Sequence, residues 1–279
     1  MKSKKTKITA AISISVLTCL FLVVVTFGAD GTSSGRTFFG WVWKILQEYY
    51  PLLLQGTLYT IIIAIIGTVV GFVIGLLVAI VRTTPKSKNP VARVLMYIVN
   101  LILRFYVFLF RGTPMMVQAM VIFYGVAMAF GVNMAPLFAG CFIVAINTGA
   151  YMAEIIRGGV ISVDPGQNEG AYAIGMTHWQ TMTSVIMPQA IRNSLPSITN
   201  QLIVNLKDSS VLSCISVTEL FYIGKRAAGT YARYFEAFAI VSVIYLILTG
   251  VSNFVISKVE KKLNGPQNYS MQNFDKGSC

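Results

Sequence analysis

Long runs without a charged residue dominate this chain and restrict the folds open to it. Residues 49–81 form one such run, and a helix needs only about 20 predominantly apolar residues to cross a membrane. Only 11% of the 279 residues are charged, against about 25% in ordinary soluble domains. The sequence therefore predicts an all-α integral membrane protein.

Six membrane-spanning segments are predicted. The first, 8–29, follows a lysine-rich stretch and is either a retained anchor or a signal peptide; the indifferent cleavage site favours a retained anchor. The second is expected to begin near Gly56. The third should bend at Arg111, Gly112 and Pro114, because proline removes a backbone donor and glycine weakens the helix beside it. The five later segments are 56–81, 94–130, 136–153, 193–218 and 237–257.

Lysines and arginines at the ends of these segments predict the orientation. They gather before residue 8, in the loop from Arg82 to Arg93, and after residue 257. By the positive-inside rule these regions are cytoplasmic. The protein is therefore expected in the plasma membrane, with both termini in the cytoplasm. The chain then divides into a basic amino terminus with its anchor (1–30), an extracellular segment leading into the core (31–55), a transmembrane domain with a cytoplasmic loop at 164–188 (56–258), and a cytoplasmic tail (259–279).

Three glycines recur at every fourth position of the second span. Gly67, Gly71 and Gly75 would lie on one face of a helix and let another helix approach closely. The same glycines could also be merely tolerated in a membrane helix, and the sequence leaves both readings open.

The polar segment 164–188 carries signals for two short helices joined by a glycine, and we call it the elbow. Asp164 is placed to cap a first helix, with Pro165 in its first turn and Gln167 completing an approximate capping box. Gly175 supplies the stop, because glycine takes a left-handed conformation without steric cost.

The second half of the elbow restarts the helix. Thr177 with Gln180 three residues later predicts another capping box, and Pro188 is expected to end or kink the second helix. The only histidine, His178, is expected to lie at the start of this helix. A cytoplasmic helical elbow of this kind predicts a docking element for a partner.

Charged and polar residues inside the spans are the other candidates for function. Lys207 and Asp208 interrupt an otherwise uncharged crossing, where a charge facing lipid costs roughly 2.5 to 3.5 kcal/mol. They should pair, face a polar cavity, or mark a break in the helix near a surface. A role in a translocation pathway and a structural ion pair are both open.

Other polar side chains lie on the neighbouring crossings. Glu154 and Arg157 are about one helical turn apart and can pair. The amides of Gln118, Asn147 and Asn205 could either bridge helices by hydrogen bonds or line a path for a polar solute.

Several activities lack their residues in this sequence. No P-loop pattern is present, so any ATP hydrolysis would take place on another chain, and no cofactor is expected here. One histidine and four scattered cysteines predict no metal site. The net charge of +12 sits at the ends of apolar runs, which argues against binding to nucleic acid.

The elbow resembles the EAA signature of bacterial ABC-importer membrane subunits. The matching positions are Glu169, Gly170, Ala171, Gly175, Val185, Met187 and Pro188, with Gly170, Val185 and Met187 as conservative departures from the pattern. In that family the segment is the coupling helix, which docks into a groove of a separate ATPase. The resemblance therefore implies an ATPase contact at Glu169, Gly170, Ala171, Gly175 and Pro188.

Further motifs narrow the resemblance to the permeases for polar amino acids. They are QGTLYTIIIAIIG at 55–67, FRGTP at 110–114, AYMAEIIRGGV at 150–160 and LKDSSVLSCISVTEL at 206–220. This resemblance implies a five-helix permease core, here with one extra N-terminal transmembrane helix or signal-like segment. It also implies a homo- or heterodimer of permease subunits, two ATPase subunits, an extracellular solute-binding protein and transport by alternating access. Permeases for another small solute, such as methionine or a peptide, and a membrane-embedded enzyme or channel are the alternatives.

Overall fold

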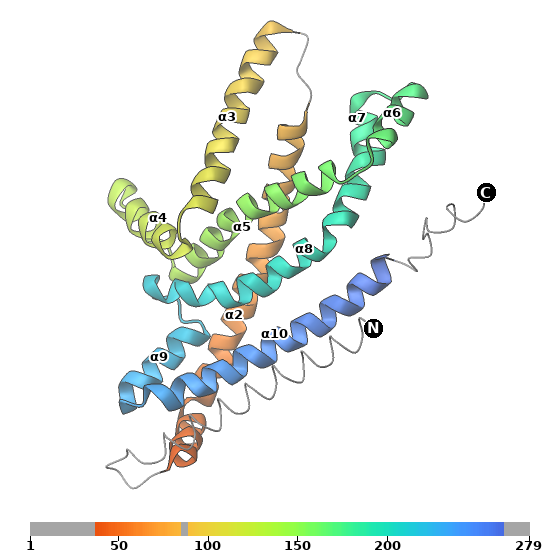
Figure 1. Cartoon of the computed structure of the whole chain (residues 1–279). Helices are drawn as coiled ribbons and strands as arrows, with labels where there is room; N and C mark the ends of the chain where they lie inside the picture. The colour runs from red at the N-terminus through yellow and green to blue at the C-terminus, as the bar shows by residue number, and fades with distance from the viewer. Residues whose placement is uncertain (1–36, 85–88, 265–279) are drawn as a thin grey trace, which may run out of the picture.

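The structure is a computed structural model that describes residues 37–84 and 89–264 (Figure 1). This part of the chain is helical and contains no strand, as the apolar runs predicted. In chain order its elements are α2 (Phe38–Thr83), α3 (Pro90–Gly112), α4 (Met115–Phe130), α5 (Pro136–Ile161), α6 (Pro165–Ala173), α7 (His178–Gln180), the π-helical turn η1 (Thr181–Ile186), α8 (Met187–Asp208), the 3₁₀ helix η2 (Ser209–Ile215), α9 (Leu220–Tyr231) and α10 (Tyr234–Asn264).

Four of the described helices are long and apolar enough to cross a membrane: α2, α3, α5 and the stretch Tyr234–Glu260 of α10. Helix α4 is apolar but shorter. The crossing predicted at 193–218 falls on α8 and η2 and is more polar than these four. Helix α8 packs against α2, α5 and α10 and buries three of its polar side chains, Ser194, Gln201 and Asn205, within the protein. The predicted span 8–29 lies outside the described residues.

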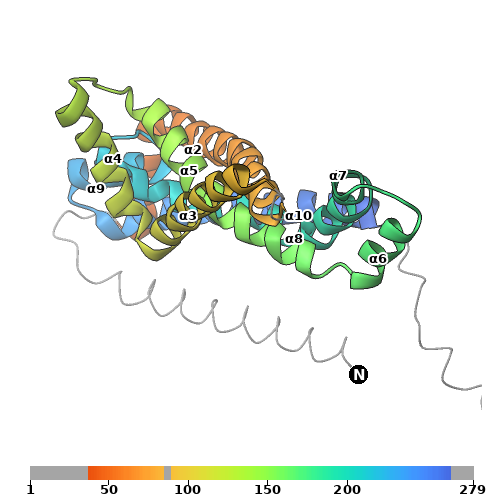
Figure 2. The same cartoon turned by 90° about the horizontal axis from the view of Figure 1, so that it is seen from above.

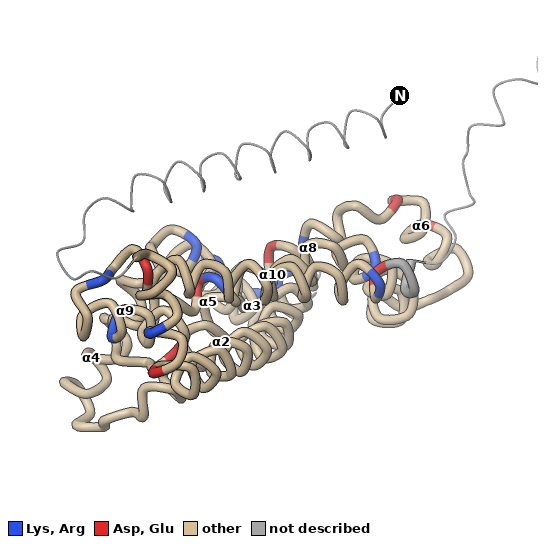
Figure 3. Tube along the Cα trace, turned by 90° about the horizontal axis from the view of Figure 1, so that it is seen from below, with Lys and Arg blue, Asp and Glu red and all other residues tan. Residues whose placement is uncertain are grey.

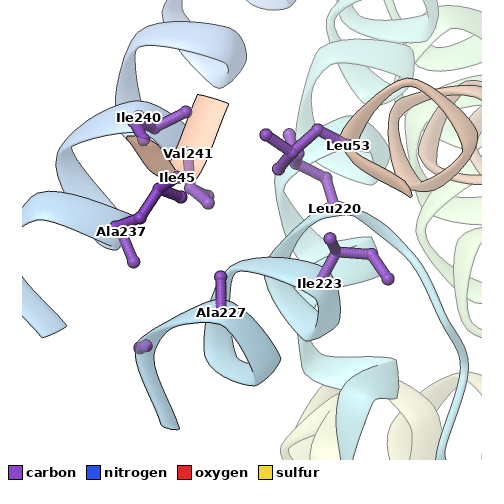
Figure 4. Packing of buried hydrophobic residues seen from close by; sticks show 9 residues of the cluster. Ile45, Leu53, Leu220, Ile223, Ala227, Ala237, Ile240 and Val241 are labelled. Atoms are coloured by element: carbon purple, nitrogen blue, oxygen red, sulfur yellow. The ribbon is translucent and has the colours of Figure 1, made fainter. Parts of the chain in front are cut away.

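Helix α2 begins at Phe38, so the predicted start near Gly56 is wrong. Pro51 lies inside this helix without ending it. Its first half is helical because it packs on α9 and α10 through Ile45 and Leu53 (Figure 4). Their partners in this buried cluster include Leu220, Ile223, Ala227, Ala237, Ile240 and Val241. Much of the segment predicted as a connection at 31–55 is therefore part of a long helix.

The predicted bend in the third span is a complete break. Helix α3 ends at Gly112, and α4 starts at Met115 after Pro114. Pro114 has an extended backbone (ψ 136°) and so separates two helices, because proline cannot continue the hydrogen-bond ladder of α3. The interruption at this sequence is confirmed, and it is sharper than a bend.

The glycine ridge of α2 lets α5 approach closely. A Cβ atom added to Gly67 would lie 2.4 Å from Val144 Cγ1, and one added to Gly75 would lie 2.4 Å from Met152 Cβ. Gly71 meets Thr148 between these two contacts, with 2.7 Å to its Cβ. Every fourth residue of α2 therefore faces every fourth residue of α5, and the close-approach reading of the glycines is confirmed.

The elbow and helix α4 lie at opposite ends of the molecule (Figure 2). Helices α6 and α7 project at one end, and α4 and α9 lie at the other (Figure 2). Between them, α2 and α5 form the most extensive helix pair. Charged residues occupy few positions on a mostly neutral chain, and several of them lie near one another (Figure 3).

Candidate functional site

The first helix of the elbow is built as its sequence predicted. Asp164 caps α6, because its Oδ1 accepts a hydrogen bond from Gly166 N at 2.7 Å. Gly175 has φ +83°, in the left-handed region, and its N–H donates to Tyr172 O at 3.0 Å. Met176 N then donates to Ala171 O at 3.1 Å. These bonds satisfy carbonyls at the end of α6 and turn the chain.

The second helix of the elbow also begins where predicted. Thr177 and Gln180 form a reciprocal capping box, with Gln180 N donating to Thr177 Oγ1 at 3.3 Å and Thr177 N donating to Gln180 Oε1 at 2.9 Å. His178 is the first residue of α7, and its Nδ1 lies 2.8 Å from Tyr172 OH across the turn. The two short helices are thus tied together by a side-chain hydrogen bond as well as by the glycine.

One detail of the predicted elbow is wrong, and a second is wrong in part. Gln167 does not complete a capping box with Asp164; its Oε1 accepts from Gln189 Nε2 at 3.4 Å. Pro188 does not end the second helix, because it lies in the first turn of α8. The π-helical turn η1 directly before it widens the helix, so the chain stays helical around a residue that lacks an N–H.

The elbow presents an exposed surface at its turn. Glu169, Gly170, Gly175 and Pro188 are exposed, whereas Ala171 is buried. Apolar side chains are exposed around the turn as well, with Ile174 at 79% and Trp179 at 61% of their full accessibility. Such residues on a short polar segment are suited to contact with another protein.

The elbow is mounted on two helices that pack tightly at its base. Gly159 of α5 lies against α8, where an added Cβ would be 2.4 Å from Ala190 O. Ser194 Oγ donates to Ile155 O at 3.1 Å, and Asn193 Nδ2 donates to Ser162 Oγ at 3.0 Å. The elbow is therefore attached to two helices that are packed and hydrogen-bonded to each other at its base.

Glu154 forms the centre of a charged cluster between helices, which we call the Glu154 cluster. Its Oε2 accepts from Arg157 Nε at 2.8 Å, so the predicted pair is confirmed. Its Oε1 accepts from Arg82 Nη1 of α2 at 2.5 Å. Arg111 of α3 approaches the same carboxylate at 4.0 Å and stacks over the ring of Tyr151. One acid on α5 thus links three arginines from three helices.

The amides of Gln118 and Asn147 meet at the break between α3 and α4. Gln118 Nε2 donates to Phe110 O at 2.9 Å and to Thr113 O at 2.8 Å, which are carbonyls freed where α3 ends. Asn147 Nδ2 donates to Gln118 Oε1 at 2.8 Å. Both side chains are buried, and their bonds join α5 to the broken helix. The helix-bridging reading of these two amides therefore fits their geometry.

Asn205 joins α8 to both helices of the glycine-lined pair. Its Nδ2 donates to Thr68 Oγ1 of α2 at 2.8 Å, and its Oδ1 accepts from Thr148 Oγ1 of α5 at 3.1 Å. The side chain of Asn205 is buried. Its position next to Gly71 and its contacts support a bridging role.

Lys207 and Asp208 end α8 where the chain changes to the 3₁₀ helix η2. Both are exposed, and neither forms an ion pair with another residue of the part that the structure describes. Consecutive residues of a helix do not face each other, which explains why the two do not pair. Lys207 lines an open groove of about 460 Å³ together with hydroxyl groups of Ser210, Ser242 and Thr249.

Sequence reasoning missed several partners of these residues. It did not connect Arg82 with Glu154, and it did not single out Tyr106, whose OH donates to Ile146 O at 2.6 Å. It also missed Glu219, a fully buried carboxylate that caps α9 and accepts from Tyr245 OH at 3.0 Å. The capping role of Glu219 could have been read from its place before the helical stretch, but the distant partners could not.

The fold and the elbow define a class, the multi-pass membrane proteins with an exposed pair of short helices between two core helices. Within that class the chain belongs to the family described as binding-protein-dependent transport system inner membrane component, whose family model matches residues 89–265. It is therefore a multi-pass protein of the bacterial inner membrane with a role in transport, and the predicted resemblance to importer permeases is confirmed.

Individual relatives agree with this assignment. The chain is 35% identical over 222 residues to the glutamine transport system permease protein GlnP of Escherichia coli (strain K12), covering 79% of this chain and 97% of GlnP. It is 32% identical over 226 residues to the probable amino-acid permease protein YxeN of Bacillus subtilis (strain 168), covering 80% and 96%. It also resembles a crystal structure of an amino acid ABC transporter with histidines, with 36% identity, a TM-score of 0.68, and coverage of 78% of this chain and 96% of that one.

Proposed function

We propose that the chain is the permease subunit of an ATP-driven ABC importer that passes a polar amino acid across the plasma membrane. Its family and its relatives, named for glutamine and amino-acid transport, support this proposal. The observation that carries it is the elbow, an exposed, doubly capped pair of helices held at the ends of two packed core helices. A permease for another small solute, such as methionine or a peptide, is the second candidate.

The elbow is the proposed contact with the ATPase. Its exposed residues around Gly175 include the apolar side chains of Ile174 and Trp179, which a groove on a partner would cover. Closure of two ATPase subunits around ATP would push the elbow. Because α5 and α8 pack together at its base, they would move as a unit and exchange inward-open and outward-open states.

The remaining partners follow from the same proposal. A second permease subunit, identical or different, would complete the transport unit, and an extracellular solute-binding protein would deliver the amino acid. ATP would bind only to the ATPase subunits. Both termini of this chain would lie in the cytoplasm, on the side of the elbow, as the lysine and arginine clusters indicate.

Lys207 is the proposed pathway residue with the best support. Its ammonium group forms no ion pair with a described residue and lines an open groove together with apolar side chains and four hydroxyl-bearing ones, Ser210, Ser242, Tyr245 and Thr249. An ammonium group with nearby hydroxyls suits the carboxylate that every amino acid carries. The amides of Gln118, Asn147 and Asn205 are already bonded to protein groups and act in this proposal by fixing the helices around the path.

The conformation of Gly175 gives a direct test of the elbow. In Gly175→Val a branched side chain would have to adopt φ +83°, which L-residues avoid, so the turn should rearrange. We expect uptake to fall roughly tenfold or more, with less ATPase co-purified and normal insertion of the chain.

The matched control is Gly229→Val, which places the same side chain on α9 with nothing within 4 Å of its Cβ. This variant should transport normally. The measurements are uptake in vesicles that contain the complete importer and the amount of ATPase that co-purifies with the permease. Wild-type values of both for Gly175→Val would refute the coupling role of the elbow.

A further inference from the structure

A basic cleft lies between the end of α2 and the first half of α3. It has a volume of about 480 Å³, and its lining includes Arg82, Arg93 and Arg104, together with Tyr97 and Asn100. Figure 1 shows the two helices diverging here, with α3 (yellow) extending past the end of α2 (orange). The cleft is separate from the elbow and from the groove beside Lys207.

The charges of this cleft are not neutralised by the part of the protein that the structure describes. No acidic residue lines it, and only Arg82 has an acidic partner, Glu154. Arg93 and Arg104 form no ion pair with a described residue. Two free guanidinium groups facing one concave surface favour an anion, because guanidinium binds phosphate and carboxylate oxygens in a bidentate manner.

The spacing along α3 places these groups on one face. Arg93 and Arg104 are about three helical turns apart, and Asn100 lies between them on the same side. The neighbouring faces of α3 are apolar and exposed, for example at Val94, Ile98 and Leu101. A ligand that fits both surfaces carries an anionic group for the arginines and an apolar part for the helix.

We propose that the cleft binds the head group of an anionic phospholipid, whose acyl chains lie along the exposed apolar surface of α3. The position agrees with this occupant, because the loop after Arg82 is rich in basic residues and is assigned to the cytoplasmic surface. Basic pockets between membrane helices on that side bind acidic lipid head groups. Long arginine side chains can keep their charged ends at the interface while their stems contact apolar surface. The site does not depend on the transported substrate.

Native mass spectrometry of the full-length chain tests the proposal. The purified, delipidated protein receives equal amounts of phosphatidylglycerol and phosphatidylcholine, and the retained lipids are counted. We expect a clear preference for phosphatidylglycerol in the wild type. In Arg93→Gln/Arg104→Gln this preference should fall about tenfold or more, since each basic residue near a membrane surface strengthens binding several-fold.

Two variants serve as controls. Lys225→Gln/Arg226→Gln removes the same charge from exposed positions on α9 and should keep the preference. Arg93→Lys/Arg104→Lys keeps the charge at the cleft and should retain most of it.

Five results would overturn the proposal. Wild-type protein that retains both lipids equally would do so whatever the variants show. So would an unchanged preference in the double glutamine variant, or an equal loss in the α9 control. Release of phosphatidylglycerol by millimolar inorganic phosphate would identify a site for a free anion. A change of the dimer mass in the glutamine variant, with its lipid count unchanged, would identify the cleft as a contact between copies of the chain.

Discussion

The elbow and the Glu154 cluster both concentrate polar residues on an apolar chain, but they are organised in opposite ways. Most of the bonds within the elbow join residues no more than six positions apart, such as Thr177 with Gln180, and most of its side chains are exposed. The Glu154 cluster joins residues as far apart as Arg82 and Glu154, and these side chains are mostly covered.

This difference separates two tasks. The caps and the turn of the elbow are held by local bonds, its Met182, Val185 and Ile186 pack against the ends of α5 and α8, and its outer surface is exposed. The Glu154 cluster ties α2, α3 and α5 together, with Glu154 and Arg82 mostly covered and Arg111 and Arg157 partly open to solvent. Changes in the first region should therefore affect coupling with little effect on stability, and changes in the second should affect stability first.

The largest effect should come from Glu154→Gln. The substitution leaves Arg82 without its ion pair in a mostly covered position, and the loss of one partner of such a pair costs about 3 kcal/mol. We expect a fall of the thermal unfolding midpoint by several degrees in detergent.

The control for this change is Glu169→Gln, an exposed acid on the elbow. It should leave the unfolding midpoint within error and reduce the amount of ATPase that co-purifies. If Glu154→Gln and Glu169→Gln lower the unfolding midpoint by similar amounts, or reduce the co-purified ATPase by similar amounts, the proposed division between coupling and stability is wrong.

The next largest effect concerns the packing of α2 against α5, the helix that leads into the elbow. In Gly75→Ala the new methyl group would lie 2.4 Å from Met152 Cβ and 2.8 Å from Ala153 N, so α2 and α5 have to separate. Overpacking of this kind costs about 1–3 kcal/mol. The same substitution at Gly250 of α10, where nothing lies within 4 Å, should be neutral or slightly stabilising. Equal unfolding midpoints for the two variants would contradict the close approach of the helices.

The contrast between the two regions also explains which features the sequence could predict. Asp164, Gly175, Thr177 and Gln180 act on groups within a few residues, so their pattern predicted the caps and the turn correctly. The partner of Glu154 on α2 depends on how two distant helices pack. Only Arg157, one turn away on the same helix, could be assigned from spacing.

The wrong predictions have the same origin. The second span was expected to start near Gly56, but packing of Ile45 and Leu53 on α9 and α10 keeps the preceding residues helical. Pro188 suggested an end or a kink; the helix does not end there, because the π-helical turn before it accommodates the missing donor. In both places tertiary packing or an irregular helix overrides a local signal.

A smaller effect is expected at Asn205, which bridges α8 to α2 and α5. Asn205→Ala removes the hydrogen bonds to Thr68 and Thr148, and such bonds between membrane helices are worth about 0.6 kcal/mol each. We expect a loss of about 1 kcal/mol in the free energy of unfolding. Asn205→Asp keeps the acceptor for Thr148 but loses the donor to Thr68, and it places a carboxylate at a buried position. It should therefore be no more stable than Asn205→Ala. Wild-type stability in both would show that these bonds do not hold α8 in place.

The smallest energy is expected for the coupling between Lys207 and Asp208 in a double-mutant cycle. This coupling energy tells whether the two residues form a structural ion pair like those of the Glu154 cluster. Their side chains leave adjacent positions of α8 in different directions and are exposed, so Lys207→Gln and Asp208→Asn should have additive effects on unfolding, within about 0.5 kcal/mol. The same cycle on Glu154 and Arg157, which are bonded at 2.8 Å, should give a clearly larger coupling energy.

Lys207→Gln alone should also raise the substrate concentration needed for half-maximal uptake, since it removes the ammonium group from the groove. A large coupling energy between Lys207 and Asp208, with unchanged uptake for Lys207→Gln, would make the pair a structural element and remove Lys207 from the proposed path.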